Sequence, residues 1–211
     1  MVVKRDGEAT KHRILKVAEK IFAEKGFAGA RIDEIARAAQ VNKALIYYYF
    51  ENKQSLLDEL FRGFFKESSR MLVNYVRHGG LETGPPNDAD KYMEEYFSYF
   101  SRKRDLLRIM LAESLKRSDQ APPLFKLVDF SDLLGEEEAE EMQARGAFQT
   151  EKMNQILVTE FFTGVVPLLM FVLFKEQWCG HFRLSEEELD RYYEKAMDMT
   201  HVAYHRSGEK Q

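Results

Sequence analysis

The chain has 211 residues, of which 45% are hydrophobic and 31% charged. This composition excludes a disordered chain and is enough for one compact domain or two modest ones. The single cysteine, Cys179, excludes a disulfide framework and a cysteine-rich metal site, and it fits a reducing cytoplasm. No apolar run follows the basic N-terminal residues, so no secretory signal is predicted. The longest apolar stretch, Phe161 to Phe174, has 14 residues. A membrane-spanning helix needs about 20, so we expect a buried helix and no membrane partner.

Charge is divided unevenly along the chain. Residues 1–53 carry 11 Lys+Arg and 7 Asp+Glu, a net charge of +4, whereas residues 54–211 carry 20 and 28, a net charge of −8. A small basic head on a larger acidic body indicates that the head is the part that meets a polyanion.

Helical periodicity dominates from the start of the chain, without strand-like alternation, and predicts an all-α protein of about nine helices. The first four are expected over about 10–25, 31–39, 42–49 and from 52 onward. Gly26 is placed to end the first helix. Asn42 and Asn52 can cap the third and fourth, because an Asn side chain accepts a hydrogen bond from a free backbone amide.

The second part of the chain is predicted to be helical as well. A loop is expected from His78 to Asp88, then helices around 92–100 and 106–111, and an irregular section up to about Gly146. A long helix should span about Phe148 to Trp178 and end at Cys179-Gly180, with a kink at Pro167 that Gly164 eases. Ser185 and Glu188 form a capping box for the last helix.

Residues 31–50 have the layout of a helix-turn-helix: a short helix, a turn of three or four residues, and a second helix capped by Asn42. Two small residues, Ala36 and Ala39, allow the helices to approach closely. The shared core with the first helix is predicted to consist of Ile35, Val41, Ile46 and Phe50. The outward side of the second helix then carries Lys43, Ala44, Leu45, Tyr47 and Tyr48.

This segment resembles the TetR family of transcriptional regulators over residues 10–60. The matching elements are Gly26-Phe27, Ile35-Ala36, Val41-Asn42-Lys43, Ile46-Tyr47-Tyr48-Tyr49-Phe50 and Lys53. The resemblance implies a helix-turn-helix DNA-binding domain at 1–53 and a ligand-binding and dimerisation domain at 54–211. Gln40 stands at a turn position where the family often has glycine. A glutamine tolerates the left-handed backbone conformation less well than glycine, at a cost of about 1 kcal/mol.

The resemblance also implies roles for single residues of the head. Lys43, Tyr47 and Tyr48 match positions that contact the DNA backbone or base edges, and Lys53 matches a phosphate contact. Arg31 stands where the family often has a capping Thr; an arginine reaches phosphate but caps poorly. The DNA-binding residues are therefore expected to be Arg31, Asn42, Lys43, Ala44, Leu45, Tyr47, Tyr48 and Lys53.

For the body, the resemblance implies a homodimer that pairs through the last two helices and a pocket among the middle helices. The predicted interface residues are Leu189, Tyr192, Tyr193, Ala196, Met197, Thr200 and Tyr204; alternatively, these stripes serve only the core of one chain. The predicted pocket, for a small apolar or aromatic ligand, is formed by Tyr96, Phe97, Phe100, Met110, Phe161, Phe162, Met170 and Phe171, which could equally be close-packed core.

No catalytic or cofactor-binding fingerprint is visible, so we expect neither enzymatic activity nor a cofactor. His201 and His205 stand four apart on one helix, a metal-binding spacing, but no third ligand follows convincingly, and we expect no metal. The sequence predicts a cytoplasmic, homodimeric repressor that binds double-stranded operator DNA and is released by a small molecule. The alternative is a helical small-molecule-binding protein that has lost DNA binding.

Overall fold

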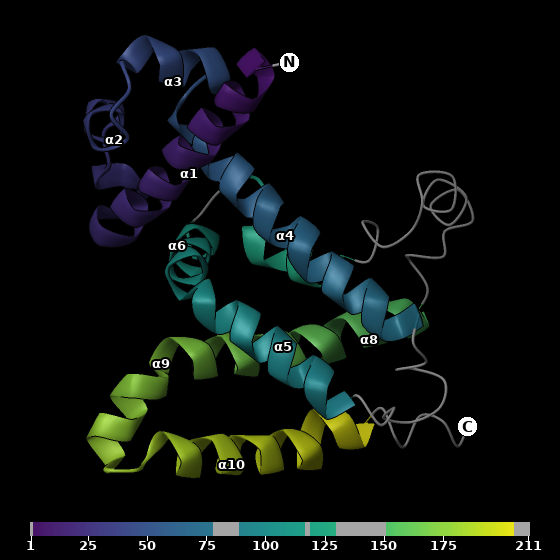
Figure 1. Cartoon of the computed structure of the whole chain (residues 1–211). Helices are drawn as coiled ribbons and strands as arrows, with labels where there is room; N and C mark the ends of the chain where they lie inside the picture. Colours follow the sequence, from purple (N-terminus) through teal and green to yellow (C-terminus); the bar gives the residue numbers. More distant parts are fainter. Residues whose placement is uncertain (1, 78–88, 117–118, 130–150, 205–211) are drawn as a thin grey trace. The chain divides into compact units, whose positions relative to one another are not determined.

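The computed structural model describes residues 2–77, 89–116, 119–129 and 151–204. All secondary structure in these ranges is helical, which confirms the predicted all-α class (Figure 1). The predicted loop at 78–88 and most of the predicted irregular section lie outside the described residues. Backbone contacts divide the chain into an N-terminal unit, Met1–Lys66 with Asp105–Pro123, and a C-terminal unit, Glu67–Arg104 with Leu124–Gln211. The functional boundary between residues 53 and 54 stays a prediction.

The N-terminal unit contains the predicted three-helix head. Its elements are α1 (Val2–Gly29), α2 (Ile32–Ala38), α3 (Lys43–Tyr49), the first turns of α4 (Lys53–Arg77) and most of α6 (Arg104–Ser114). The apolar stripes of these helices provide the core: Ile14, Phe22, Ile35, Ile46, Leu56 and Leu107 are each less than 2% exposed. Burial of such side chains is the main term that holds short helices like α2 and α3 in place.

Local capping explains where these helices begin and end. The Leu45 amide donates to Asn42 Oδ1 at 2.7 Å at the start of α3. At the start of α4, the Ser55 amide donates to Asn52 Oδ1 at 2.9 Å. Both asparagine caps were predicted and are confirmed. Gly26 leaves the helical conformation with φ 70°, although one more turn follows it before α1 ends.

The C-terminal unit contains the end of α4 from Glu67 onward, α5, and a long helix that folds back into a last helix (Figure 1). Its elements are α5 (Ala89–Arg102), a 3-10 turn η1 (Pro123–Leu127), α8 (Glu151–Thr159), the π-helical η4 (Glu160–Val165), α9 (Val166–Phe182), α10 (Glu186–Met197) and the π-helical η5 (Asp198–Val202). α9 packs against α5 and α10, and the two π-helical segments pack against each other. α8, η4 and α9 follow one another without a break, as predicted for the long helix.

Two details of the long helix differ from the prediction. It ends at Phe182 and not at Cys179-Gly180, because Gly180 stays helical and Arg183 takes the left-handed conformation at φ 57°, its amide donating to the Cys179 carbonyl. The irregularity predicted around Pro167 takes the form of η4, a π-helical stretch just before the proline. There Gly164 admits the His201 ring of η5, since a Cβ at Gly164 would lie 2.8 Å from His201 Cε1.

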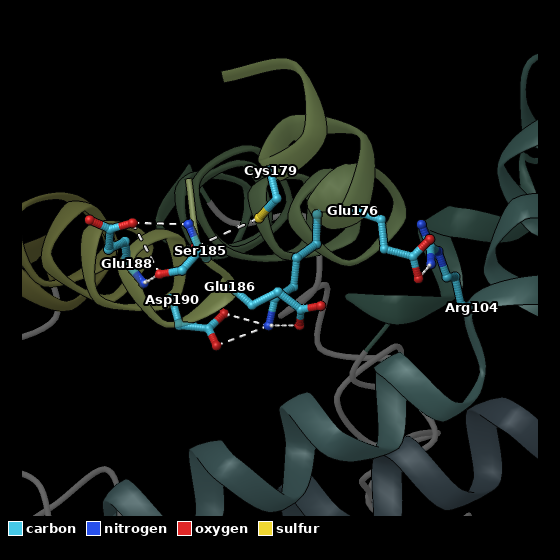
Figure 2. Close-up of polar contacts among 8 residues, drawn as sticks. Arg104, Glu176, Cys179, Ser185, Glu186, Glu188 and Asp190 are labelled. Atoms are coloured by element: carbon cyan, nitrogen blue, oxygen red, sulfur yellow. Dashed lines mark hydrogen bonds and ion pairs between the residues drawn. The ribbon is translucent and has the colours of Figure 1, made fainter. Parts of the chain in front are cut away.

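Polar contacts fix the turn between α9 and α10 (Figure 2). The Glu188 amide donates to Ser185 Oγ at 3.1 Å and the Ser185 amide to Glu188 Oε2 at 2.9 Å, which confirms the predicted capping box. Lys175 of α9 pairs with Asp190 at 2.7 Å and Glu186 at 3.2 Å on α10. Partial burial opposes the charge of Lys175, but its hydrogen bonds to Asp190 and Glu186 raise its pKa. The pairs join α9 to α10 across the turn.

Candidate nucleic-acid interface

The helix-turn-helix is built as its sequence predicts. Ala36 and Ala39 are buried at the junction of α2 and α3, where larger side chains would force the helices apart. The turn closes with a hydrogen bond of 3.0 Å from the Val41 amide to the Ala36 carbonyl. Gln40 has φ 54°, so the left-handed turn conformation expected at this position is present without a glycine. A non-glycine residue in that conformation carries a strain of about 1 kcal/mol.

The outward side of α3 is open to solvent. Lys43 and Ala44 are exposed, Tyr47 is 47% and Tyr48 79% exposed, and Leu45 is half-buried. Tyr47 and Tyr48 therefore form an exposed aromatic pair on this side of the helix. Every predicted α3 residue thus lies where a duplex can reach it, and its contact with DNA stays a prediction.

Arg31 precedes α2 and is exposed. It has the extended conformation of an N-cap residue, yet its side chain makes no capping hydrogen bond. The prediction that an arginine caps poorly here is confirmed. Its guanidinium is therefore not engaged in holding the helix start.

Lys43 has a partner that the sequence did not reveal. Its Nζ lies 2.9 Å from Asp33 Oδ1, in the first turn of α2. The hydrogen bond to Asp33, together with the attraction between the two charges, raises the pKa of Lys43 and keeps it protonated. Ten residues separate the two in the chain, so no helical spacing indicates the pair.

Lys53 is a predicted phosphate contact, but its ammonium group donates hydrogen bonds within the protein. Its Nζ donates to the carbonyls of Phe27 at 2.6 Å, Ala30 at 3.0 Å and Ala28 at 3.4 Å. It also lies 4.5 Å from the centre of the Phe27 ring. These carbonyls end α1, so Lys53 joins the start of α4 to the end of α1. To meet a phosphate it would have to release at least one of them.

Replacing Lys53 with Met should lower the free energy of unfolding by about 1.5–3 kcal/mol, the range for hydrogen bonds to a charged group. The Met side chain keeps the apolar stem but leaves the end of α1 without its donor. Urea unfolding followed by circular dichroism measures the change. Lys116→Met is the matched control, because Lys116 also lies over Phe27, at 5.6 Å, without bonding these carbonyls. A Lys53 variant of unchanged stability but weakened DNA binding would instead support the phosphate contact.

The predicted ligand residues lie in several parts of the described structure, and their role in binding stays a prediction. A groove of about 570 Å³ lies between α9 and α10. Of the predicted set it includes Met170 and Phe171. Phe97 meets Phe171 and Tyr193 from α5, each at 5.5 Å between ring centres.

The other members of the predicted ligand set lie elsewhere. Tyr96 contacts Phe100 at 4.5 Å between ring centres. Phe161 contacts Phe162 at 5.1 Å, and Phe162 is largely exposed. Met110 is fully buried and belongs to the N-terminal unit.

The predicted interface residues, from Leu189 of α10 to Tyr204 just after η5, fall into two sets. Leu189 is buried and Tyr193 and Met197 are half-buried within the chain, so they serve its own core at least in part. The exposed set is Tyr192, Ala196, Thr200 and Tyr204. Sequence reasoning missed the exposed aromatic side chains of α9, Phe174, Trp178 and Phe182, which follow one another at intervals of four residues and share one side of the helix.

The long helix is open on one side. The helix Asn154–Phe182 is long and apolar enough to cross a membrane, by length and composition only. Core helices of soluble proteins pass the same test, but they are mostly buried. Here only 22% of the most apolar 18-residue window is buried within the described chain. The buried side holds Leu168, Leu169, Val172 and Leu173. The prediction of a buried helix is right for that side only. No described residue of the same chain covers the opposite side of the helix.

The comparisons with known proteins agree with this architecture. Residues 14–60 match the family model "Bacterial regulatory proteins, tetR family". The HTH-type transcriptional repressor SCO4008 of Streptomyces coelicolor is 37% identical over 112 residues, 53% of either protein. The HTH-type transcriptional repressor NicS of Pseudomonas putida is 28% identical over 116 residues, 53% of this chain and 51% of that protein. The chain thus spans about half the length of the curated relatives it matches.

Solved structures show the same fold over more of the chain. HlyIIR, a hemolysin II transcriptional regulator, aligns with a TM-score of 0.53 at 22% identity, covering 92% of this chain and 98% of that one. The fatty acid degradation regulator FadR of Bacillus halodurans aligns with a TM-score of 0.51 at 21% identity, covering 89% and 93%. The fold and the head are those of a helix-turn-helix protein. The match over residues 14–60 and the named relatives support the assignment of the head to the TetR family.

Proposed function

We propose that this protein is a homodimeric, sequence-specific DNA-binding repressor of the cytoplasm that a small apolar or aromatic ligand releases from its operator. The observation that carries the proposal is the outward side of α3. It begins at a capped N-terminus, presents Lys43, Tyr47 and Tyr48 to solvent, and is held by the buried Ile46 behind it. A short helix of this kind fits the major groove, with its first residues at the base edges.

A dimer is part of the proposal, because one helix-turn-helix contacts too few base pairs for useful specificity. The occupant proposed for the open side of α9 and α10 is a second copy of the chain. Support comes from the row Phe174, Trp178 and Phe182, each about half exposed, with the exposed Tyr192 of α10 beside the same groove. Two such sides placed around a two-fold axis would cover each other, and a dimer that reads two half-sites one helical turn apart needs its heads about 34–36 Å from each other.

The ligand is proposed to bind among the aromatic side chains where α5, α9 and α10 meet. Phe171 stacks on Tyr193 at 4.0 Å between ring centres, and Phe97 meets both rings edge-on. Within the described residues, the Tyr193 hydroxyl is buried without a hydrogen-bond partner, and burial raises its pKa. A ligand with an apolar body and one acceptor would satisfy that hydroxyl. By linkage, a ligand that prefers a conformation with wrongly spaced heads lowers the affinity for DNA.

Fluorescence anisotropy with duplexes from the DNA flanking the gene tests the proposal. One fragment should bind at nanomolar concentrations, and the affinity should fall steeply between low and physiological salt, since each neutralised phosphate contributes a slope of about −0.9 on a logarithmic plot. The rival, a helical small-molecule-binding protein that has lost DNA binding, predicts no binding to any duplex even at low salt. That outcome would refute the proposal.

A further inference from the structure

The first turn of α2 carries two neighbouring carboxylates, and each binds a lysine of another helix. Glu34 pairs with Lys25 of α1. Asp33 pairs with Lys43 of α3 at 2.9 Å. An acidic residue in a first turn is favoured by the helix dipole, which accounts for the residue type at both positions. It does not account for the choice of a recognition-helix lysine as the partner of Asp33.

The Asp33–Lys43 pair lies on the open surface of the head and not in its core. The Lys43 side chain is 50% exposed and that of Asp33 is 68% exposed. Exposed pairs of this kind add little to folding stability. A phosphate oxygen can therefore approach the same ammonium group from solvent, and the pair can open without disturbing the buried residues.

For Lys43, the carboxylate of Asp33 and a DNA phosphate are the same kind of ligand. Both present anionic oxygens to an N–H donor and form short charge-assisted hydrogen bonds. An ammonium group has three donors, so Lys43 could keep Asp33 while it meets a phosphate, but this arrangement brings two anions close together and they repel. Either Lys43 releases Asp33, or the complex retains the repulsion between the Asp33 carboxylate and the phosphate. Both outcomes weaken DNA binding.

We propose that Asp33 is an intramolecular substitute for phosphate, which occupies Lys43 in the free protein and sets the affinity of the head for DNA. The inference rests on the proposed DNA-binding function. It makes Asp33 a positioning residue that limits affinity through Lys43, although Asp33 itself need not touch the duplex.

Asp33→Asn, which removes the charge and keeps the shape, tests this inference. The probe is a random-sequence duplex of about 30 base pairs, roughly three turns, so that no operator has to be known. At low salt the variant should bind about three- to tenfold more tightly than the unaltered protein, as expected for one exposed ion pair in each of two heads. The gain should shrink as salt is raised, because the charges are then screened.

Glu24→Gln is the matched control, since Glu24 is an exposed carboxylate of α1 in the same unit and its loss changes the net charge equally. The control should change the affinity by less than the Asp33 variant. Asp33→Ser serves as a second variant that also suits a helix start, and thermal unfolding shows that both variants are folded.

A double-mutant cycle with Lys43→Gln separates the local effect from the general one. In the Lys43→Gln background, Asp33→Asn should produce little or no gain, because the ammonium group that it would set free is gone. An equal gain in both backgrounds, or no gain in either, overturns the inference while leaving the proposed function intact. If the unaltered protein binds no duplex at low salt, the proposed function fails and the inference fails with it.

Discussion

Replacing Lys43 and Tyr47 together with alanine should abolish operator binding, with a loss of affinity of at least about 100-fold. Each side chain stands on the outward side of α3, and a lost phosphate or base contact costs about 1–3 kcal/mol, twice over in a dimer with two heads. Anisotropy titration of the bound flanking fragment measures the loss. The core behind α3, with Ile46 fully buried, is untouched, so the fold should persist.

The control for this variant is Lys20→Ala, which removes one exposed positive charge from α1 of the same unit. It should lower the affinity only through the smaller net charge, by a few-fold at low salt. Sedimentation should give the same mass for the double variant as for the unaltered protein, since α3 lies outside the proposed dimer interface. Unchanged affinity in a folded double variant would mean that α3 is not the recognition helix.

The parts of the fold that local chemistry determines could be predicted from the sequence. Asn42, Asn52 and Ser185 each cap a helix through a hydrogen bond to a residue three positions away, so the partner is fixed by spacing alone. The apolar stripe that places Ile35 and Ile46 in the core has the same local origin. The outward side of α3 follows directly, because it is what remains once the buried stripe is assigned.

The contacts of the two lysines could not be predicted, because they join helices whose separation the sequence does not state. Lys53 bonds carbonyls 23 to 26 positions earlier, and this depends on where Gly26 turns the end of α1. Lys43 reaches Asp33 only because the turn at Gln40 sets α2 and α3 at one angle. The resemblance to a family named both lysines as candidate DNA contacts and was silent about their partners.

The end of the long helix shows a different limit of sequence reasoning. Gly180 was expected to end the helix, since glycine favours the left-handed position after a helix. Arg183 takes that position instead, and Gly180 remains helical. Ser185 caps α10 two residues later, so the chain reverses directly before the next capping box, and Lys175 pairs with Asp190 across this turn.

The apolar side of α9 could not be assigned from the sequence because its first half, from Val166 to Phe174, carries no polar side chain. Periodicity separates a core-facing stripe from a polar one only when a polar side exists. The structure separates Leu169, which is 1% exposed, from Phe174, at 51%, and Trp178, at 48%. The side that holds the latter two needs a partner of its own, and the proposed dimer supplies one.

Replacing Phe174 and Trp178 together with glutamate should convert the dimer into a monomer and remove operator binding with it. Four carboxylates would then enter the apolar interface of each dimer, and each buried charge without a partner costs several kcal/mol, so the dimer should dissociate at least about 1000-fold more readily. Sedimentation equilibrium measures the mass, and anisotropy the loss of DNA binding. The fold of each chain should survive, because both side chains are half-exposed in it.

The control is Leu115→Glu, which places one glutamate at an apolar side chain that is 77% exposed but belongs to the N-terminal unit. This variant should remain dimeric. A double glutamate variant that stays dimeric and binds DNA normally would show that α9 pairs with nothing through this side. The same apolar row that suits a second copy also suits hydrocarbon. If the unaltered protein binds lipid vesicles and the glutamate variant does not, a membrane is the partner of the open side instead.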